Sequence, residues 1–273
     1  MMNKQEVLSI LEQYGLSATK SLGQNFLCNP DVIGRILELA EISDSTRVLE
    51  IGPGIGALSE EAVSRAGKYV AVEIDRSFFE RLSAIIDSCG GRVIYSDYLQ
   101  FAPSDLDPSE VPDVIISNLP YYVMTPIILK VLADFPECRK MVYMVEEEAE
   151  ARIFAKPGTK QYGPLAVLTE LFGVKKKEFI VDRNSFVPPP NTTSAVITIT
   201  RREGLSWKNG WSRFVESAFA LRRKTLVNSL SAAGISDKVK VAGALREMGR
   251  QETARAEELG PDEFVRLYEI LTK

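Results

Sequence analysis

Short apolar runs that end in polar or glycine residues occur throughout the first half of the chain. They cover residues 48–51, 69–75, 92–97 and 112–118. Runs of this length and composition are typical of buried strands. The first run leads through a glycine-rich turn into a helix expected to begin near Ala57, which is the order found in nucleotide-binding α/β units. The pattern therefore predicts an α/β fold with a mostly parallel, twisted sheet.

The end of the chain follows a helical spacing instead. One helix is expected to run from Trp211 to Leu230, with Gly234 available to end it. Two more are expected over residues 237–248 and from Pro261, where the sequence carries N-terminal helix signals. The aromatic residues at this spacing are interpreted as core rather than as a base-stacking platform.

The domain boundary is expected between the last strand and these helices. Residues 184–191 form a proline-rich turn, and residues 194–200 have the composition of a strand that completes the sheet. We therefore predict a larger α/β domain over residues 1–203 and a small all-helical domain over residues 204–273.

A glycine-rich turn follows the first predicted strand in the sequence Val48-Leu49-Glu50-Ile51-Gly52-Pro53-Gly54-Ile55-Gly56. Glycines at such a turn let the backbone approach a ligand closely, although this spacing differs from that of dinucleotide and phosphate-binding loops. The next strand ends in a carboxylate about 20 residues downstream, where nucleotide-binding units place the acid that binds ribose hydroxyls. Together these features indicate a ligand with a ribose.

Polar side chains stand at the carboxyl ends of the later strands as well. Asp97 ends the run 92–97, and Asn118 ends the run 112–118. In open parallel sheets, ligands bind in the crevice outside these ends. Either residue alone could simply begin a turn, but four polar strand ends in series favour a site.

The segment Ser117-Asn118-Leu119-Pro120-Tyr121-Tyr122 suits the alkylation of an exocyclic amine. An Asn carbonyl and a backbone carbonyl held by the following Leu-Pro can accept hydrogen bonds from an NH₂ group, and a neighbouring aromatic ring can stack on an extruded base. The alternative is an ordinary strand-to-loop exit, since Asn and Pro are common turn formers. Beside the glycine-rich turn, the segment predicts methylation of adenine at N6.

Together these motifs resemble the ribosomal RNA adenine N6,N6-dimethyltransferase family, most of all the branch that modifies two adjacent adenosines near the 3′ end of small-subunit ribosomal RNA. The similarity runs over nearly the whole chain. It implies a Rossmann-like fold that uses S-adenosylmethionine. The residues that carry it are Lys20-Ser21-Leu22-Gly23-Gln24-Asn25-Phe26-Leu27, Glu50-Ile51-Gly52-Pro53-Gly54, Asn118-Leu119-Pro120-Tyr121, Phe186-Val187-Pro188-Pro189-Pro190, Ser194-Ala195-Val196 and Arg222-Arg223-Lys224-Thr225-Leu226.

The resemblance also implies roles for single residues at the cofactor. Residues 1–45 would close over S-adenosylmethionine through Asn25 and Leu27. Gly52 would lie under its methionine portion, Glu73 would hold the ribose hydroxyls, and Asp97 would face its adenine amine. Asn118 would also contact the cofactor. Asn25 has an alternative role as the cap of the helix that starts near Pro30, for which Asn29 is better placed.

For the target base, the resemblance implies that Asn118 and Pro120 accept hydrogen bonds from the N6 amine. Tyr121 and Phe186 would sandwich the flipped adenine. Because the same amine would receive two methyl groups, we expect a roomy site around Asn118.

The chain departs from the family pattern at a few positions. Tyr122 and Met124 stand where Asn and Ser are common, and acids at residues 146–148 replace a Gln-Lys-Glu sequence. Acids suit the first turn of a helix, so a structural reason is the simpler one. An RNA contact by the missing Lys is in doubt.

The residue inventory agrees with this chemistry. Histidine is absent, which removes the usual general base and the commonest metal ligand, so no metal is expected. The sulfonium of S-adenosylmethionine already makes its methyl group electrophilic, so the enzyme must mainly hold N6 in line and exclude water.

Composition predicts a folded enzyme of the cytoplasm, expected to be a monomer. The chain has 273 residues, of which 45% are hydrophobic, enough for one large domain and a smaller one. No apolar run reaches the roughly 18 residues that suggest a membrane span, and the start is polar rather than a signal peptide. Cys28, Cys89 and Cys138 are scattered, which favours reduced thiols.

The net charge of −4 seems at odds with an RNA partner, because phosphate contacts supply much of nucleic-acid affinity. Its distribution is uneven. Residues 1–203 hold 21 Lys and Arg against 28 Asp and Glu, whereas residues 204–273 hold 12 against 9. The best RNA-binding candidates are Arg222, Arg223 and Lys224. The run 175–177 is equally well explained as a solvated face.

We therefore expect an enzyme that dimethylates adenosines of small-subunit ribosomal RNA in an immature ribosomal subunit. A large-subunit adenine methyltransferase of the antibiotic-resistance branch shares both motifs, but the full N-terminal segment and the Phe-Val-Pro-Pro-Pro context favour the small subunit. A non-catalytic assembly factor is the second alternative. Intact Glu73, Asp97 and Asn118 argue for catalysis.

Overall fold

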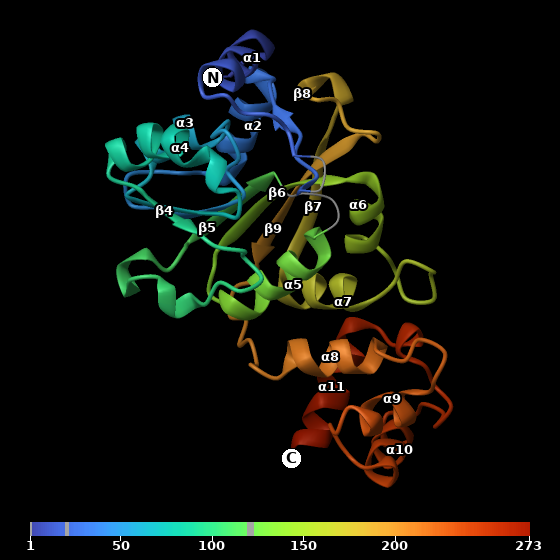
Figure 1. The fold of residues 1–273 in the computed structure, drawn as a ribbon. Coiled ribbons are helices and arrows are strands. Elements are labelled where there is room, and N and C mark those ends of the chain that lie inside the picture. Colours follow the sequence, from blue (N-terminus) through green and yellow to red (C-terminus); the bar gives the residue numbers. More distant parts are fainter. Residues whose placement is uncertain (1, 20–21, 119–122) are drawn as a thin grey trace.

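The computed structural model describes residues 2–19, 22–118 and 123–273. A seven-stranded sheet, in the order β4-β3-β2-β5-β6-β9-β7, forms its centre (Figure 1). The first five strands of this order, from β4 through β3, β2 and β5 to β6, run parallel. Strand β9 is antiparallel to both β6 and β7. The predicted α/β class with a mostly parallel sheet is confirmed. The strands are β2 (Arg47–Ile51), β3 (Lys68–Glu73), β4 (Arg92–Tyr95), β5 (Val114–Asn118), β6 (Lys140–Glu146), β7 (Gly173–Val181) and β9 (Ser194–Arg201).

Helices cover both faces of the sheet because side chains alternate along each strand. Val48 and Val114 face one core with helices α2 (Pro30–Ala40), α3 (Ser59–Arg65) and α4 (Phe79–Ile85). Leu49 and Ile115 face the other core. The helices on that side are α5 (Met124–Asp134), α6 (Glu147–Ile153) and α7 (Pro164–Phe172). The result is a three-layer sandwich whose central strands, β2, β3, β5 and β6, are buried on both faces.

The N-terminal segment wraps over the carboxyl ends of the parallel strands. It starts with α1 (Lys4–Gln13) and continues into β1 (Phe26–Leu27), which pairs antiparallel with β8 (Phe186–Val187). Asn29 caps α2, since its side-chain oxygen accepts from two backbone N–H groups of the first turn. Asn25 is thereby free of a capping role, as the sequence favoured.

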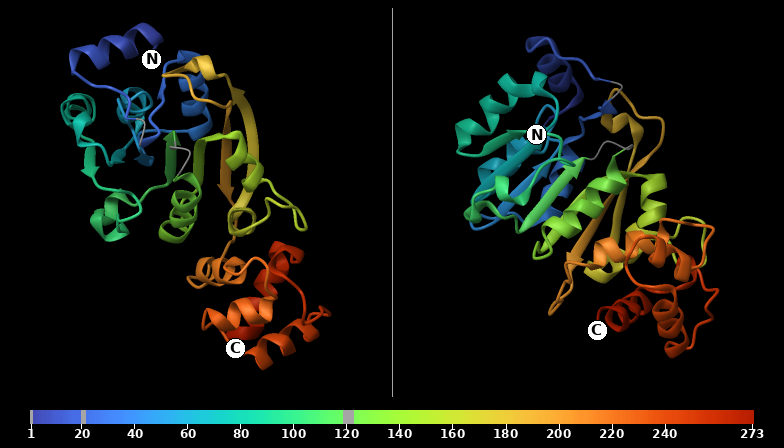
Figure 2. Two further views of the ribbon diagram at one scale, coloured as in Figure 1. Left: turned by 45° about the vertical axis from the view of Figure 1, so that its right-hand side comes forward. Right: turned by 60° about the horizontal axis from the view of Figure 1, so that its bottom comes forward.

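The C-terminal helices lie at one end of the molecule in all three views (Figures 1 and 2). The prediction of a single helix from Trp211 to Leu230 is wrong, because α8 (Trp211–Phe219) and α9 (Leu226–Ala232) are separate helices. Thr225 has an extended backbone and accepts from the Asn228 N–H, so it starts a new helix. Beyond these, α10 (Lys238–Glu247) and α11 (Pro261–Thr272) lie where they were expected.

These helices share one continuous apolar core with the sheet. Phe214 and Phe219 of α8 belong to the same cluster as Leu168 of α7 and Ile199 of β9. The division of the chain at residue 203 stays a prediction, since the packing continues across it.

Within the described residues there are also short 3₁₀ turns, namely η2 (Arg76–Phe78), η3 (Asp87–Cys89), η4 (Pro103–Asp105), η5 (Pro108–Glu110), η6 (Arg183–Ser185) and η7 (Ala256–Glu258). Within the three described ranges, every helix is too short or too polar to cross a bilayer.

Candidate active site

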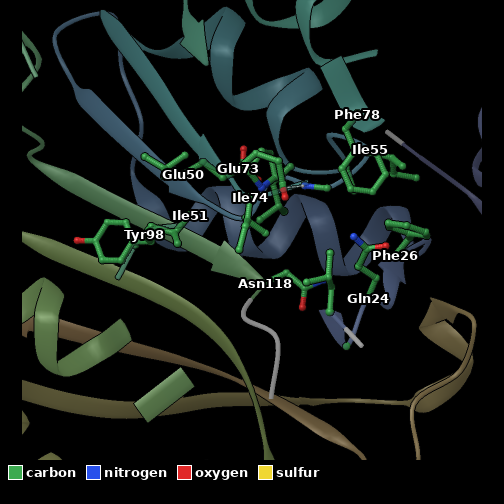
Figure 3. A pocket seen from close by; sticks show the side chains of 18 of the residues that line it. Gln24, Phe26, Glu50, Ile51, Ile55, Glu73, Ile74, Phe78, Tyr98 and Asn118 are labelled. Atoms are coloured by element: carbon green, nitrogen blue, oxygen red, sulfur yellow. Dashed lines mark hydrogen bonds between the residues drawn. The ribbon is translucent and has the colours of Figure 1, made fainter. Parts of the chain in front are cut away.

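A cavity of about 220 Å³ opens at the carboxyl ends of β2, β3 and β5, under the N-terminal segment (Figure 3). We call it the strand-end pocket. It lies where the strand order changes direction between β2 and β5, the usual ligand position in such sheets. The six residues predicted to contact a cofactor all line it, namely Asn25, Leu27, Gly52, Glu73, Asp97 and Asn118.

The glycine-rich turn after β2 forms the floor of the pocket. Gly52 has a φ of 67°, a left-handed conformation that glycine adopts without a steric penalty. Its N–H donates to the carbonyl of Val72 on β3, at 2.9 Å. The turn therefore places bare backbone at the pocket, as its composition predicted.

Glu73 is the buried acid of the site, with only 4% of its surface exposed. Its two carboxylate oxygens accept from the Gly54 N–H at 2.9 Å and the Asp75 N–H at 2.8 Å. Burial raises the pKa of Glu73, and the backbone hydrogen bonds oppose that shift. A carboxylate oxygen can accept more than one hydrogen bond, so Glu73 keeps capacity for ligand hydroxyls.

Glu50 is a second buried acid, for which no role of its own was predicted. It lines the pocket and accepts from Ser59 Oγ at 2.6 Å and from the Tyr69 hydroxyl. Burial raises the pKa of Glu50 to about 7, against the effect of these two hydrogen bonds. Through these hydrogen bonds, the carboxyl group of Glu50 on β2 connects to Tyr69 on β3 and to Ser59 on α3.

Asn118 ends β5 with its side chain toward the pocket (Figure 3). Its Nδ2 donates to the backbone carbonyl of Asn25, at 3.1 Å. A carbonyl can only accept, so this contact fixes which end of the amide is which. Among the described residues, Oδ1 has no hydrogen-bond donor and is available to an amine.

Asp97 follows β4 and accepts from the Leu99 N–H through Oδ1, at 2.9 Å. Asn25 donates through its side-chain Nδ2 to the carbonyl of Gly23, at 3.0 Å. Both residues line the pocket, Asp97 after β4 and Asn25 in the N-terminal segment.

The pocket also has an apolar wall that the sequence did not assign. Phe26 and Phe78 meet edge to face, with ring centroids 5.8 Å apart, and both line the cavity. Ile74, directly after Glu73, is 52% exposed although strand patterning suggested a buried position. A large exposed apolar side chain at a pocket indicates a flat apolar ligand. Only three-dimensional structure could separate Ile74 from the buried strand residues before it.

Of the residues predicted to contact the target base together with Asn118, the structure describes only Phe186. Pro120 and Tyr121 lie outside the described residues. Phe186 is 1% exposed, pairs with Leu27 through β8, and is not among the described residues that line the pocket.

The basic residues proposed for RNA lie in the turn between α8 and α9 rather than on a helix. Arg222, Arg223 and Lys224 are exposed there. Arg222 donates to the carbonyl of Lys160 at 2.9 Å. By contrast, the run 175–177 is neutralised locally, because each of its lysines pairs with a glutamate.

Arg222 also lines a second, larger hollow of about 950 Å³ between α5, α6 and α8. We call it the α6–α8 cleft. Its charged lining mixes cations and acids: Arg152, Lys160, Arg222, Glu147, Glu148 and Glu216. Glu147 and Glu148 stand in the first turn of α6, as expected for acids at a helix start.

Residues 2–19, 22–118 and 123–273 contain no cluster of three or more His, Cys, Asp or Glu side chains arranged to hold a metal ion.

Comparison with known proteins gives consistent results. Residues 15–273 match the family model of ribosomal RNA adenine dimethylase. The chain is 39% identical over 274 residues to ribosomal RNA small subunit methyltransferase A of Anoxybacillus flavithermus, covering 96% of this chain and 93% of that protein. Identity to the protein of the same name from Listeria welshimeri is 40% over 275 residues, with the same coverage.

Two solved structures resemble the fold closely. A dimethyladenosine transferase from Plasmodium falciparum superposes with a TM-score of 0.71 at 25% identity, covering 89% of this chain and 95% of that one. The 23S rRNA methyltransferase ErmE superposes with a TM-score of 0.59 at 26% identity, covering 91% and 100%.

Proposed function

The chain belongs to the ribosomal RNA adenine dimethylase family, and we propose that it transfers methyl groups from S-adenosylmethionine to N6 of two adjacent adenosines near the 3′ end of small-subunit ribosomal RNA. The product is N6,N6-dimethyladenosine, made during assembly of the small ribosomal subunit. The observation that carries the proposal is the convergence of Glu73 and Asn118 on one pocket. It brings a ribose-binding acid and an amine acceptor together.

The residues of the strand-end pocket fit S-adenosylmethionine. Glu73 can accept hydrogen bonds from ribose hydroxyls, and Asp97 can accept one from an adenine amine. Gly52 leaves room for the methionine portion, and Asn25 and Leu27 cover it. The apolar surface of Ile74, 52% exposed, is positioned to pack on the adenine ring. When bound, the cofactor supplies an electrophilic methyl group on its sulfonium.

Asn118 supplies the chemistry that the protein itself must provide. Its Oδ1 accepts one N6–H of the target adenine, with the carbonyl of Pro120 as the second acceptor. Both contacts favour a more tetrahedral, nucleophilic nitrogen in the transition state. The proton is lost to water after transfer. After the first methylation one N–H remains, which still satisfies one acceptor.

Tyr121 and Phe186 are proposed to stack on the flipped base. Phe186 is buried against the N-terminal segment, so base entry requires that side chain to become accessible. The exposed turn at Arg222, Arg223 and Lys224 is proposed to contact RNA phosphates beside the α6–α8 cleft, which assigns substrate contacts to residues 204–273.

A large-subunit adenine methyltransferase is the second candidate, because ErmE shares the fold at a TM-score of 0.59. The relatives at 39–40% identity over nearly the full chain carry small-subunit names and favour the first candidate. A non-catalytic assembly role alone is less favoured, since the pocket and its acceptor are intact.

The test is methyl transfer from labelled S-adenosylmethionine to undermethylated small-subunit particles and, in parallel, to large-subunit RNA. Label in the small-subunit product alone supports the proposal. Label only in large-subunit RNA moves the chain to the resistance-type branch. Cofactor binding without transfer to either RNA makes the assembly role the leading one.

A further inference from the structure

A series of hydrogen bonds, continued by the backbone between Gln24 and Asn25, connects Glu73 with Asn118 at the strand-end pocket. The Asp75 N–H donates to Glu73 Oε1 at 2.8 Å. The Asp75 carboxylate accepts in turn from Gln24 Nε2, at 2.8 Å. The next residue, Asn25, accepts from Asn118 Nδ2 at 3.1 Å through its backbone carbonyl. The acid of the cofactor site and the amine acceptor are thus joined through the N-terminal segment.

Gln24 is the side chain that links the N-terminal segment to Asp75, two residues after the end of β3. Its Oε1 accepts from the Thr19 N–H at 2.8 Å, while its Nε2 donates to Asp75. Both ends of the amide are fixed by their partners, because a backbone N–H only donates and a carboxylate only accepts. Gln24 is half-buried, which shields this contact from water.

Asp75 is held in place for the contact. Its second oxygen, Oδ1, accepts from the Ser77 N–H at 3.0 Å and the Ser77 hydroxyl at 2.7 Å. Burial acts to raise the pKa of Asp75, but the hydrogen bonds from Ser77 and Gln24 outweigh it and lower the pKa. The residue therefore presents a carboxylate to Gln24.

The stretch beyond Gln24 is anchored on its other side by β8. Phe26 and Leu27 pair with Val187 and Phe186, and the Cys28 N–H donates to the carbonyl of Ser185 at 2.7 Å. The carbonyl of Asn25 lies between the two anchors. Its position decides where the NH₂ group of Asn118 points, and so which way the accepting oxygen faces.

From this geometry we propose that Gln24 and Asp75 are positioning residues of the methyl transfer, which rests on the function proposed above. Their hydrogen bond holds the N-terminal segment over the cofactor and, through the Asn25 carbonyl, sets the Asn118 amide with Oδ1 toward the target amine. The segment that covers the cofactor also prepares the acceptor for the base.

A polarity swap tests this pair. Gln24→Glu keeps the acceptor for Thr19 but sets a carboxylate against Asp75. Asp75→Asn must keep its oxygen for Ser77, so its NH₂ group meets the NH₂ group of Gln24. Each single change breaks the bond. The double change restores it with donor and acceptor exchanged, since the new amide at position 75 donates to the new carboxylate at position 24.

Two quantities are measured for the four proteins: the dissociation constant of S-adenosylmethionine, and kcat on undermethylated small-subunit particles at saturating cofactor. Each single variant is expected to weaken cofactor binding and to lower kcat by about tenfold, the scale of one lost partly buried hydrogen bond. The double variant is expected to recover both values to within about threefold of wild type. Thermal unfolding of all four proteins checks that they remain folded.

Two outcomes would overturn the inference. If kcat at saturating cofactor stayed at the wild-type value in both single variants, the segment would only cover the cofactor and would not set Asn118. If the double variant showed the summed losses of the single ones, the two side chains would not act as a pair. Should wild type methylate neither RNA, the proposed function fails, and cofactor affinity across the four proteins still decides whether the pair is coupled.

Discussion

The strand-end pocket and the α6–α8 cleft are built in opposite ways. The strand-end pocket is small, about 220 Å³, and its polar groups are fixed by backbone hydrogen bonds at the ends of buried strands. The α6–α8 cleft is about 950 Å³ and is lined by charged side chains of both signs. Fixed dipoles suit a transition state, whereas exposed charges suit a phosphate backbone whose exact path varies.

This difference implies that chemistry and RNA affinity can be separated by mutation. Changes in the pocket should reduce methyl transfer or cofactor affinity and leave RNA binding unchanged. Changes at the cleft should weaken RNA binding and leave cofactor affinity unchanged. A mixed result at either site would remove the distinction.

The largest effect is expected for Asn118→Ala. Loss of the amine acceptor should lower kcat by about 10²–10³-fold, the usual scale for one transition-state hydrogen bond. Cofactor affinity should fall far less than kcat, because Glu73 and the glycine-rich turn are intact. Radiolabel transfer and a binding isotherm on the same preparation measure both. Wild-type turnover by the variant would show that Oδ1 is not the acceptor.

The second largest effect is expected for Glu73→Gln, which tests whether cofactor affinity can be lowered without a change in RNA affinity. The amide keeps the shape but removes the charge from a group that accepts two backbone hydrogen bonds. Since bonds to charged groups are worth about 1.5–3 kcal/mol, cofactor affinity should fall by about 10–100-fold. Isothermal titration calorimetry measures the dissociation constant of the cofactor. RNA affinity, measured by filter binding, should not move.

The cleft is tested by replacing Arg222, Arg223 and Lys224 with Ala together. RNA affinity should fall by about tenfold, with a shallower dependence on salt, because fewer counterions are released. Replacing Lys208, Arg213 and Lys238 with Ala together is the matched control, since it removes the same charge from exposed residues that are not among the lining residues of the cleft. Binding at several salt concentrations separates the two. An equal loss in the control would mean that only net charge matters.

The smallest effect concerns Glu50 and the pH dependence of stability. Its pKa is raised to about 7 in the folded protein, above the ordinary value of 4.5. The stabilisation from its protonated form is therefore complete below pH 4.5 and is lost as pH rises through 7. Glu50→Gln should remove this loss, so the decline in Tm between these pH values becomes shallower by a few degrees. If the Tm of wild type and the Tm of Glu50→Gln changed with pH in the same way, Glu50 would not be a buried group that titrates in this range.

Much of the pocket was predictable because its signals are local. A polar residue that ends an apolar run is visible in sequence, and parallel strands bring such ends to one edge of the sheet. Glu73, Asp97 and Asn118 all lie in the pocket for this reason. The volume around Asn118 and the roles of single residues stay predictions.

What could not be predicted depends on contacts far apart in sequence. The helical spacing of apolar residues continues across the break between α8 and α9, so only the cap at Thr225 and the bond from the Leu226 N–H to the Ala254 carbonyl reveal it. The contact between Gln24 and Asp75 joins residues 51 positions apart. No periodicity encodes such a pair.

The most direct test of the central claim is the mass of the methylated nucleoside. Wild-type protein is incubated with undermethylated small-subunit particles and S-adenosylmethionine, and the adenosines near the 3′ end of the RNA are analysed by mass spectrometry. Two acceptors at the N6 amine, one of which is still satisfied after the first methylation, and the roomy site expected around Asn118 predict that N6,N6-dimethyladenosine accumulates at two adjacent positions. Strict single methylation, or no modified adenosine in this RNA, would contradict the account.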